Sequence, residues 1–551
     1  MSRRLLLAAL AVLAAALAGP GVAQAGRIAV GLEPGADVDA VVRAVERHSG
    51  AEVEHLTPIP ALVLDAPRGL DTRVLLRVRG VRYVERLHTR SLSVLPTDPL
   101  VPRQWYLTQS RFYESWLTLP ALESVAVAVI DSGVDASHPD LAGKILDARS
   151  FVGGSPRVDT LGHGTFVSGL VAAGVDNGIG IAGLAPSAEL LVAKVVTRSR
   201  AIPIEAEVRA IRWAVDRGAQ VINMSLGGVR DPMNADRDSY SRLEADAIAY
   251  AVSNGVVVVA AVGNGDQAPR RPWPYASYPA ALPHVLGVSA VTESGAVPSF
   301  SNRDEIYNDI AAPGENIISL LPRPLTSRYP SCSEQGYSSC GPDEYRGAQG
   351  TSFAAPVVTA AAATLLALRP DLAPDQVTAI LQRTAVDQTP ATGCTSCTTG
   401  RDALTGWGRL DVAAATAALS RPLPTRDRYE TNDDTGDRAF RLTGQSSRLF
   451  ATLDYWDDQD DVYAIRLRRG QRVYVGLTGR NANMDLSLAL WRPGTPSIEP
   501  VHNVGYRAKI SVQPGGRQYF SHRAGRDGWY YVQIRASAPG ATRYRLVVVK
   551  S

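Results

Sequence analysis

Hydrophobic residues are spaced differently in different parts of the chain, and the changes divide it into segments. Between residues 95 and 420, near-continuous apolar runs alternate with helical stretches rich in small residues. Parallel strands that are buried on both faces have this pattern, so the segment predicts an α/β domain with a doubly wound parallel sheet. The apolar runs are Val125 to Ile130, Leu190 to Val196, Val221 to Leu226 and Val256 to Ala261.

A small α/β unit is predicted before this domain, over residues 26–94. Arg27 to Leu32 and Val81 to Glu85 are typical of strands, and Val38 to His48 has the period of a helix. After a linker at residues 421–428, short strands between turn signals predict an antiparallel β-sandwich over residues 429–551. Its predicted strands include Arg472 to Leu477, Leu486 to Trp491, Trp529 to Ile534 and Tyr544 to Val549.

The first 25 residues have the layout of a secretory signal peptide. Arg3 and Arg4 precede the apolar run Leu5 to Ala18, and Ala23-Gln24-Ala25 has cleavage-site spacing. An uncleaved anchor is the alternative, but the run is shorter than the roughly 20 residues that a span needs. We find no later stretch long and apolar enough to span. The sequence therefore predicts a soluble mature protein, secreted to the medium or the periplasm.

Composition excludes several classes of protein. The 551 residues include 57 Lys and Arg against 54 Asp and Glu, a formal net charge of +3. This balance gives no case for binding nucleic acid or an anionic membrane. Four cysteines are too few for a disulfide-built scaffold, so stability must come from burial.

Three reactive side chains lie where an α/β fold places its active site. Asp131 directly follows the first buried strand, at the carboxyl edge of the sheet, where crevices form. His163 stands between two glycines at a predicted helix entrance. Ser352 precedes the helical run Val357 to Leu368, with Pro356 expected in the first turn. A helix N-terminus favours the negative charge that develops there during acyl transfer.

Asp, His and Ser in this order are what nucleophilic acyl transfer requires. A serine hydroxyl needs a base to take its proton, imidazole has a suitable pKa, and a carboxylate fixes the imidazole. Asn264, after the strand that ends at Ala261, places an amide where it can donate to an oxyanion. Each feature alone is more often a turn, a helix cap or a core residue. Their joint order and placement favour a catalytic site.

These residues lie in motifs that resemble those of the subtilisin-like serine proteases (subtilases), over roughly residues 98–417. The resemblance implies that Asp131 orients the imidazole, His163 is general base and then acid, Ser352 is the nucleophile and Asn264 donates to the oxyanion. The motifs are Val129-Ile130-Asp131-Ser132-Gly133-Val134-Asp135 with His138-Pro139-Asp140-Leu141, then Gly162-His163-Gly164-Thr165, and Gly350-Thr351-Ser352-Phe353-Ala354-Ala355-Pro356.

Further resemblances concern the flanking segments and substrate binding. Ser225-Leu226-Gly227-Gly228 is similar to the family's substrate-binding strand, which pairs with an extended peptide. Arg27 to Val94 resembles the propeptide of these proteases, which implies an intramolecular inhibitor that is later removed. A small non-inhibitory domain is the alternative. Residues 429–551 more loosely resemble the C-terminal domain of secreted bacterial peptidases, through Tyr429 to Asp434 and Asp460 to Tyr463.

Calcium is the cofactor that the resemblance implies, and no organic cofactor is expected. Hard oxygen ligands suit this ion. The alternative is an empty, hydrogen-bonded loop. The implied ligands are Asp140, Asn177, Gln104 and the backbone carbonyls of Val175, Ile179 and Ile181. A second acidic group is a weaker calcium candidate, more commonly explained as a solvated hairpin; it comprises Asp454, Asp457, Asp458, Asp460 and Asp461.

Four cysteines allow three disulfide connectivities. We favour the local pairing, Cys332 with Cys340 and Cys394 with Cys397, in an exported chain. No grouping of His and Cys has zinc spacing.

The sequence therefore predicts a secreted, monomeric serine endopeptidase that cleaves proteins through an acyl-enzyme and matures from its own zymogen. An esterase is one alternative, although that class expects G-x-S-x-G and the order Ser, Asp, His. A binding protein with an inert protease domain is the other, and the intact motifs disfavour it.

Overall fold

The computed structural model describes residues 27–67, 70–87, 96–116, 122–266, 268–328, 343–423, 427–456, 458–481, 484–498 and 504–551. It divides into two compact units, Met1–Leu92 and Ser93–Ser551. The predicted signal peptide lies outside the described residues.

The first unit is a small sheet with a helix packed on it. Its four strands have the order β2-β3-β1-β4, and the pairs of β1 with β3 and β4 are antiparallel. Helix α2 (Val38–Ser49) begins where Asp37 caps the Ala40 N–H and ends at left-handed Gly50. The predicted strands and helix are therefore present. The elements are β1 (Arg27–Leu32), β2 (Val53–His55), β3 (Ala61–Asp65), α3 (Thr72–Leu75) and β4 (Val81–Arg86).

A seven-stranded sheet organises the predicted α/β domain in the second unit, in the order β11-β10-β9-β8-β5-β7-β6. Every pairing between neighbouring strands is parallel, as predicted from the apolar runs. The strands are β5 (Val125–Asp131), β6 (Ile145–Ser150), β7 (Ala188–Lys194), β8 (Val221–Met224), β9 (Val257–Ala261), β10 (Val285–Val291) and β11 (Ile310–Pro313).

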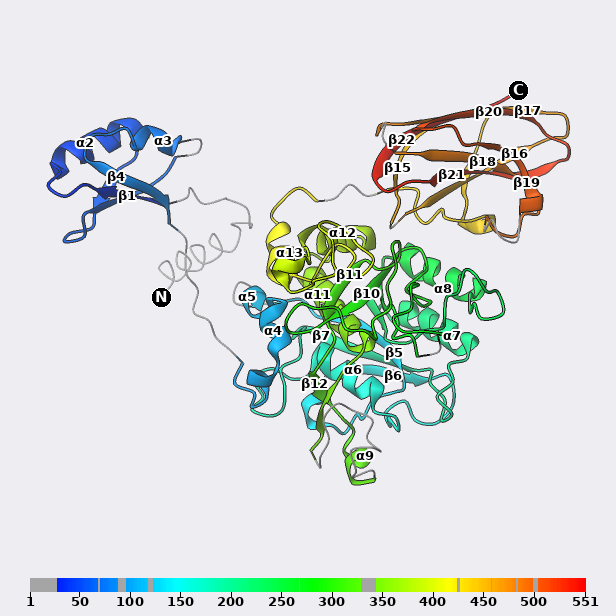
Figure 1. Ribbon diagram of the computed structural model, residues 1–551, viewed down its shortest axis with the longest axis horizontal. Helices are drawn as coiled ribbons and strands as arrows, with labels where there is room; N and C mark the ends of the chain where they lie inside the picture. The colour runs from blue at the N-terminus through cyan, green and yellow to red at the C-terminus, as the bar shows by residue number, and fades with distance from the viewer. Residues whose placement is uncertain are drawn as a thin grey trace, which may run out of the picture. The chain divides into compact units, whose positions relative to one another are not determined.

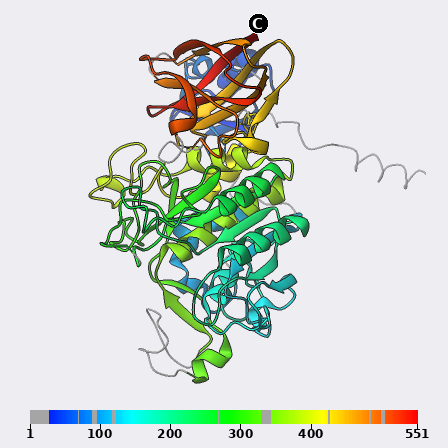
Figure 2. The same ribbon diagram turned by 90° about the vertical axis from the view of Figure 1, so that its right-hand side faces the viewer.

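Helices cover both faces of this sheet, which explains why inner strands such as β5 and β9 are almost entirely apolar (Figure 1). Val127 and Val129 of β5 point into the core that contains α6 (His163–Ala172) and α11 (Thr351–Leu368). Ala128 and Ile130 point to the opposite core. That core contains α7 (Ile204–Asp216) and α8 (Arg242–Ser253). Figure 2 shows the same layers in a view rotated by 90° about the vertical axis.

The remaining elements of the α/β domain pack around the sheet and its covering helices. Strands β12 (Ile317–Leu320) and β13 (Tyr345–Ala348) form an antiparallel pair. The other helical segments are η1 (Val101–Arg103), α4 (Trp105–Gln109), α5 (Phe112–Trp116), η2 (Pro139–Leu141), α9 (Arg323–Arg328), α12 (Pro374–Thr384), η3 (Pro390–Thr392) and α13 (Val412–Ala418).

Helix α11 corrects two predictions. It begins at Thr351 rather than Val357, so its 18 residues, with mean hydropathy 1.7, are long and apolar enough to cross a membrane. However, 89% of the helix is buried inside the protein, as expected of a core helix. Pro356 lies inside the helix and not in its first turn. The nucleophile candidate Ser352 is therefore itself a helical residue.

The C-terminal part is a β-sandwich, as predicted. A five-stranded sheet has the order β14-β16-β21-β18-β19 and a four-stranded sheet the order β15-β22-β17-β20. Alternate residues such as Val475, Leu546 and Val548 face the shared core. The elements are η4 (Gly436–Arg438), β14 (Phe440–Leu442), β15 (Ser446–Asp454), β16 (Asp460–Leu467), β17 (Arg472–Gly479), β18 (Leu486–Trp491), η5 (Val504–Tyr506), β19 (Arg507–Ser511), β20 (Arg517–Arg523), β21 (Gly528–Ala536) and β22 (Ala541–Lys550).

Candidate active site

Asp131 and His163 meet at the carboxyl edge of the parallel sheet. Asp131 is the last residue of β5 and His163 the first residue of α6. His163 Nδ1 lies 2.9 Å from both carboxylate oxygens of Asp131. The Asp131 side chain is 2% exposed and that of His163 is 33% exposed. A buried carboxylate thus holds an imidazole that substrate can reach.

The charge of Asp131 also sets the protonation of His163. Burial disfavours the imidazolium, but Asp131 and then Asp159 outweigh it and raise the pKa of His163. Nδ1 donates to the carboxylate, so in the neutral ring Nε2 is left as the basic nitrogen. Within the described residues, neither Nε2 of His163 nor the hydroxyl of Ser352 makes a hydrogen bond. Both groups are therefore available for proton transfer.

Asp159, which the sequence analysis did not single out, fixes the turn that carries His163. Its Oδ1 accepts from the Ser132 hydroxyl and the N–H groups of Leu161 and Gly162, and its Oδ2 accepts from Thr165. Ser132 in turn accepts from the Gly164 N–H. The only signal in the sequence was a carboxylate four residues before His163. This buried network locks the start of α6 against the end of β5.

The backbone carbonyl of Ser352 accepts a hydrogen bond from outside the helix because Pro356 cannot donate to it. A proline inside a helix cannot donate to the carbonyl four residues earlier, which here is that of Ser352. The Ser225 hydroxyl donates to that carbonyl instead, at 2.7 Å. Asn223 donates to Ser225, at 2.9 Å. This hydrogen bond ties Ser352 to the segment after β8.

Asn264 is oriented for donation by its neighbour in α11. Its Oδ1 accepts from both the N–H and the hydroxyl of Thr351, each at 2.9 Å. With the oxygen engaged, Nδ2 must face the other way, and it makes no hydrogen bond within the described chain. Asn264 and Ser352 line the same cavity, of about 140 Å³. A free amide donor therefore lies at a cavity that Ser352 also lines.

The predicted substrate-binding segment lines this cavity as well. Leu226, Gly227 and Gly228 all contribute to its wall. Gly228 pairs with Tyr278 through two backbone hydrogen bonds, whereas the backbone of Leu226 and Gly227 makes none in the part of the chain that the structure describes. Ser225 has the separate role already described. An extended peptide could pair with the free backbone of Leu226 and Gly227.

In the loop that resembles a calcium site, residues 175–181, hydrogen-bond donors point at the carboxylate of Asp140. Asp140 is fully buried, and burial raises the pKa of its carboxyl. Its Oδ1 accepts from Asn177 Nδ2 at 2.8 Å, and its Oδ2 accepts from the Ile181 N–H and the Tyr345 hydroxyl. Asn177 Oδ1 accepts from the Ile179 N–H. Because a cation needs oxygen atoms turned toward it, these groups do not fit calcium as arranged.

The chain before the first strand of the parallel sheet contacts this loop through Asp98, whereas the prediction named Gln104. Gln104 uses both amide atoms on the backbone of Ala182 and does not reach Asp140. Asp98 contacts the loop instead, accepting from the N–H groups of residues 176–178. The loop is held closed by protein groups.

One predicted disulfide is present. Cys394 and Cys397 are joined, with a Cα–Cα distance of 5.4 Å. Cys332 and Cys340 lie outside the described residues.

With the geometry in place, the chain can be compared with known proteins. Residues 123–408 match the sequence profile of the subtilase family, peptidase S8. This match covers more than half of the chain, and it contains Asp131, His163, Asn264 and Ser352. The chain belongs to the subtilase family.

Its relatives include several named proteases. Fervidolysin of Fervidobacterium pennivorans is 30% identical over 452 residues, which are 74% of this chain and 60% of that protein. Subtilisin E of Bacillus subtilis (strain 168) is 36% identical over 280 residues, 49% of this chain and 65% of that protein. The major intracellular serine protease of the same strain is 36% identical over 258 residues, which are 46% of this chain and 71% of that protein. This subtilase thus spans less than two thirds of fervidolysin and of subtilisin E.

Proposed function

We propose that this subtilase is a serine endopeptidase that cleaves proteins through an acyl-enzyme. The observation that carries the proposal is the pairing of Asp131 with His163 at 2.9 Å, together with the contact between the His163 ring and Phe353, the residue after Ser352 in α11, at 5.5 Å between ring centroids. A carboxylate, an imidazole and a hydroxyl in these roles form the machinery of acyl transfer. The family match supports the same chemistry.

In the proposed reaction, His163 Nε2 takes the proton of the Ser352 hydroxyl as the oxygen attacks the scissile carbonyl. The carbonyl oxygen becomes an oxyanion, which accepts from Asn264 Nδ2 and from the Ser352 N–H at the start of α11. His163 then gives its proton to the leaving amine. A water attacks the acyl-enzyme by the same route in reverse, and Asp131 stabilises the imidazolium in both halves.

Protein substrates follow from the shape of the substrate-binding segment. An extended peptide can add as a strand to the free backbone of Leu226 and Gly227, which brings its carbonyl to Ser352. The side chain next to that carbonyl then occupies the cavity of about 140 Å³. A simple ester lacks the backbone groups that use this edge, so peptides are the favoured substrates.

The proposal extends to the protein's maturation and location. Residues 1–25 would direct export, and the α/β unit that follows would block the active site of the catalytic domain until it is cleaved off by that domain. One relative is named an intracellular protease, so export needs its own test. To test export, the protein is expressed in bacteria, and the periplasmic and cytoplasmic fractions are separated. Mass analysis of the protein's N-terminus in each fraction then shows whether residues 1–25 were removed.

Casein hydrolysis by purified protein tests the activity, with the Ser352→Ala variant as the matched control. The wild type should degrade casein and lose mass corresponding to removal near residue 94, while the variant should do neither. A wild type that lost the N-terminal unit but hydrolysed only ester substrates would support an esterase. A processed wild type that hydrolysed neither would indicate an inert protease domain.

A further inference from the structure

The two sheets of the β-sandwich differ in what covers their outward sides. On the five-stranded sheet, Val462, Ala489 and Trp491 point away from the main core and are still buried, because Ala439 and Ile498 pack against them. The outward side chains of the four-stranded sheet are exposed or half-buried, and among the described residues no second core lies over them. This sheet therefore presents an uncovered surface.

The middle of this surface, here called the outer face, consists of three outward residues from each of the four strands. They are the alternate residues of 446–450 in β15, 545–549 in β22, 474–478 in β17 and 517–521 in β20. Neighbouring strands lie about 4.8 Å apart and a strand rises about 3.4 Å per residue, so the outer face measures roughly 14 Å in each direction. An extended peptide of about four residues has that length.

The outer face carries positive charge and no carboxylate. Arg448, Arg517 and Arg545 belong to it and are exposed, whereas none of its residues is Asp or Glu. Arg472 and Arg523 lie opposite each other just beyond its edge. In the part of the chain that the structure describes, Arg448, Arg517 and Arg545 form no ion pair. Their guanidinium groups can therefore bind carboxylates of a partner, which suits their forked geometry.

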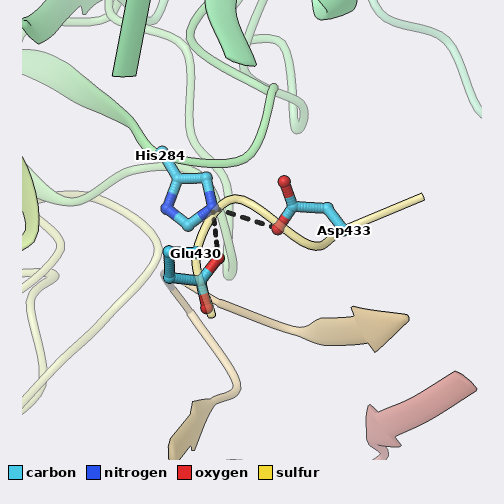
Figure 3. A group of neighbouring side chains, drawn as sticks. All are labelled: His284, Glu430 and Asp433. Atoms are coloured by element: carbon cyan, nitrogen blue, oxygen red, sulfur yellow. Dashed lines mark hydrogen bonds and ion pairs between the residues drawn. The ribbon is translucent and has the colours of Figure 1, made fainter. Parts of the chain in front are cut away.

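Carboxylates of the sandwich are used elsewhere. Asp461 is fully buried, so the solvated hairpin predicted from the acidic run is wrong for this residue. Figure 3 shows Glu430 and Asp433 beside the imidazole of His284, which precedes β10 in the α/β domain. Nε2 of His284 lies 3.0 Å from Asp433 Oδ1 and 3.3 Å from Glu430 Oε2. These contacts hold the sandwich on the α/β domain through residues that do not belong to the outer face.

Three aromatic rings lie among the arginines of the outer face. The exposed fraction is 64% for Phe450, 45% for Tyr474 and 70% for Tyr519. Apolar groups gathered in one exposed patch mark interaction sites. Tyrosine and arginine are also enriched among the residues that contribute most to protein–protein binding. The composition of the outer face therefore fits a protein partner, and its charge fits an acidic one.

Gly476, in the middle of the outer face, indicates that a partner approaches the backbone closely. A glycine weakens a strand, and it commonly marks a bulge, a bend or the close approach of a ligand. The register of β17 with both neighbouring strands is regular at Gly476, which excludes a bulge. A Cβ atom at this position would have no atom within 4 Å, so packing does not require glycine either. The glycine leaves bare backbone opposite Tyr519.

We propose that the outer face binds an extended, acidic segment of protein substrates. Carboxylates of the segment pair with the arginines, and its backbone lies over Gly476 beside the ring of Tyr519. Because the sandwich is docked on the α/β domain, a substrate held in this way has a raised effective concentration at the proposed active site. The effect on catalysis rests on the proposed function, whereas the binding itself does not.

Fluorescence anisotropy with labelled poly-L-glutamate tests the binding, in the full-length Ser352→Ala variant to prevent self-digestion. Arg517→Gln combined with Arg545→Gln should raise the Kd at least about threefold, because an exposed ion pair contributes up to about fivefold in affinity. The matched control is Arg441→Gln combined with Arg466→Gln, which removes two exposed arginines of the five-stranded sheet and should leave the Kd unchanged. No binding by the parent chain, or an equal rise in both double variants, would overturn the proposal.

Gly476→Val separates loss of binding from loss of folding. A β-branched side chain suits a strand, so this variant should unfold at a urea concentration no lower than the parent chain does. Its side chain would occupy the space over the backbone, and it should weaken binding of poly-L-glutamate as much as the loss of the two arginines does. An unchanged Kd in this variant would show that no partner approaches Gly476, contrary to the proposal.

The catalytic consequence is tested with two substrates of the active, mature protein. Arg517→Gln combined with Arg545→Gln should raise KM for succinylated casein, an acidic protein, and leave kcat/KM for a short neutral peptide unchanged. An unchanged KM for succinylated casein would refute the role in catalysis. A parent chain that hydrolyses neither substrate would refute the proposed function, and the anisotropy measurement would still decide whether the outer face binds acidic chains.

Single-stranded DNA is another anionic polymer that binds to exposed rings and cations. Labelled oligothymidylate with the same number of charges should bind the parent chain more weakly than poly-L-glutamate. Tighter binding of oligothymidylate that is lost in Arg517→Gln combined with Arg545→Gln would assign the outer face to nucleic acid and overturn the proposal.

Discussion

Asp159→Asn tests how the active-site turn is built. Oδ1 accepts from Ser132, Leu161 and Gly162 and can stay an oxygen in the variant. Oδ2 becomes an amide nitrogen and no longer accepts from the Thr165 N–H. That orphaned donor costs about 1–3 kcal/mol, and three charged bonds become neutral ones, each about 1 kcal/mol weaker. The expected loss in free energy of unfolding is about 4–6 kcal/mol, a large part of the stability of a typical domain.

The same variant should also shift the pH dependence of catalysis. The charge of Asp159 helps to raise the pKa of His163. His163 must be neutral to act as base, so kcat/KM falls as pH drops below that pKa. Without the charge the pKa is lower, and the acid limb should move to lower pH.

Urea denaturation and kcat/KM measured against pH check both effects. Asp216→Asn is the matched control, because its side chain is 51% exposed at the end of α7. If Asp159→Asn unfolded at the same urea concentration as the control, with an unmoved acid limb, the assigned role of Asp159 would be wrong.

Three further predictions concern single side chains. Asn264→Ala should lower kcat about 10²–10³-fold with little change in KM, because its amide acts on the transition state; an equal rise in KM would argue against this role. Ser225→Ala orphans the Ser352 carbonyl and should cost about 1–3 kcal/mol in thermal unfolding. Burial and then Glu244 raise the pKa of Glu207 well above its usual value, so its contribution to stability is complete below about pH 4.5 and is lost as pH rises. Glu207→Gln should remove this slope of up to about 1.4 kcal/mol per pH unit, seen in unfolding at several pH values, and exposed Glu205→Gln should not.

Much of the fold could be predicted because the spacing of hydrophobic residues indicates which faces of each strand and helix are buried. Strands such as β5 and β9 are apolar on both faces, which only a sheet covered on both sides requires. The role of Ser352 stays a prediction, but the pairing of Asp131 with His163 could be predicted because each of the two lies in a motif with its own chemistry. Their approach in space follows from the parallel topology, which brings strand ends and helix starts to one edge.

The residues that hold this site in place were harder to find in the sequence. Asp159 and Ser225 act through hydrogen bonds across the fold, and no local pattern marks such partners. Pro356 was misplaced because a proline normally marks a helix start, whereas here its missing donor is replaced by Ser225. The burial of Asp461 depends on the sandwich around it, so the acidic run alone favoured a solvated hairpin.

Fluorophosphonate labelling, followed by mass analysis of the labelled peptide, tests the central claim most directly. The probe reacts only with a serine activated by a base next to an oxyanion site. The account predicts a single modified peptide containing Ser352 in the mature protein, and no labelling in His163→Ala. Label on another serine, or a mature protein that stays unlabelled, would contradict the assignment of Asp131, His163 and Ser352 as the catalytic residues.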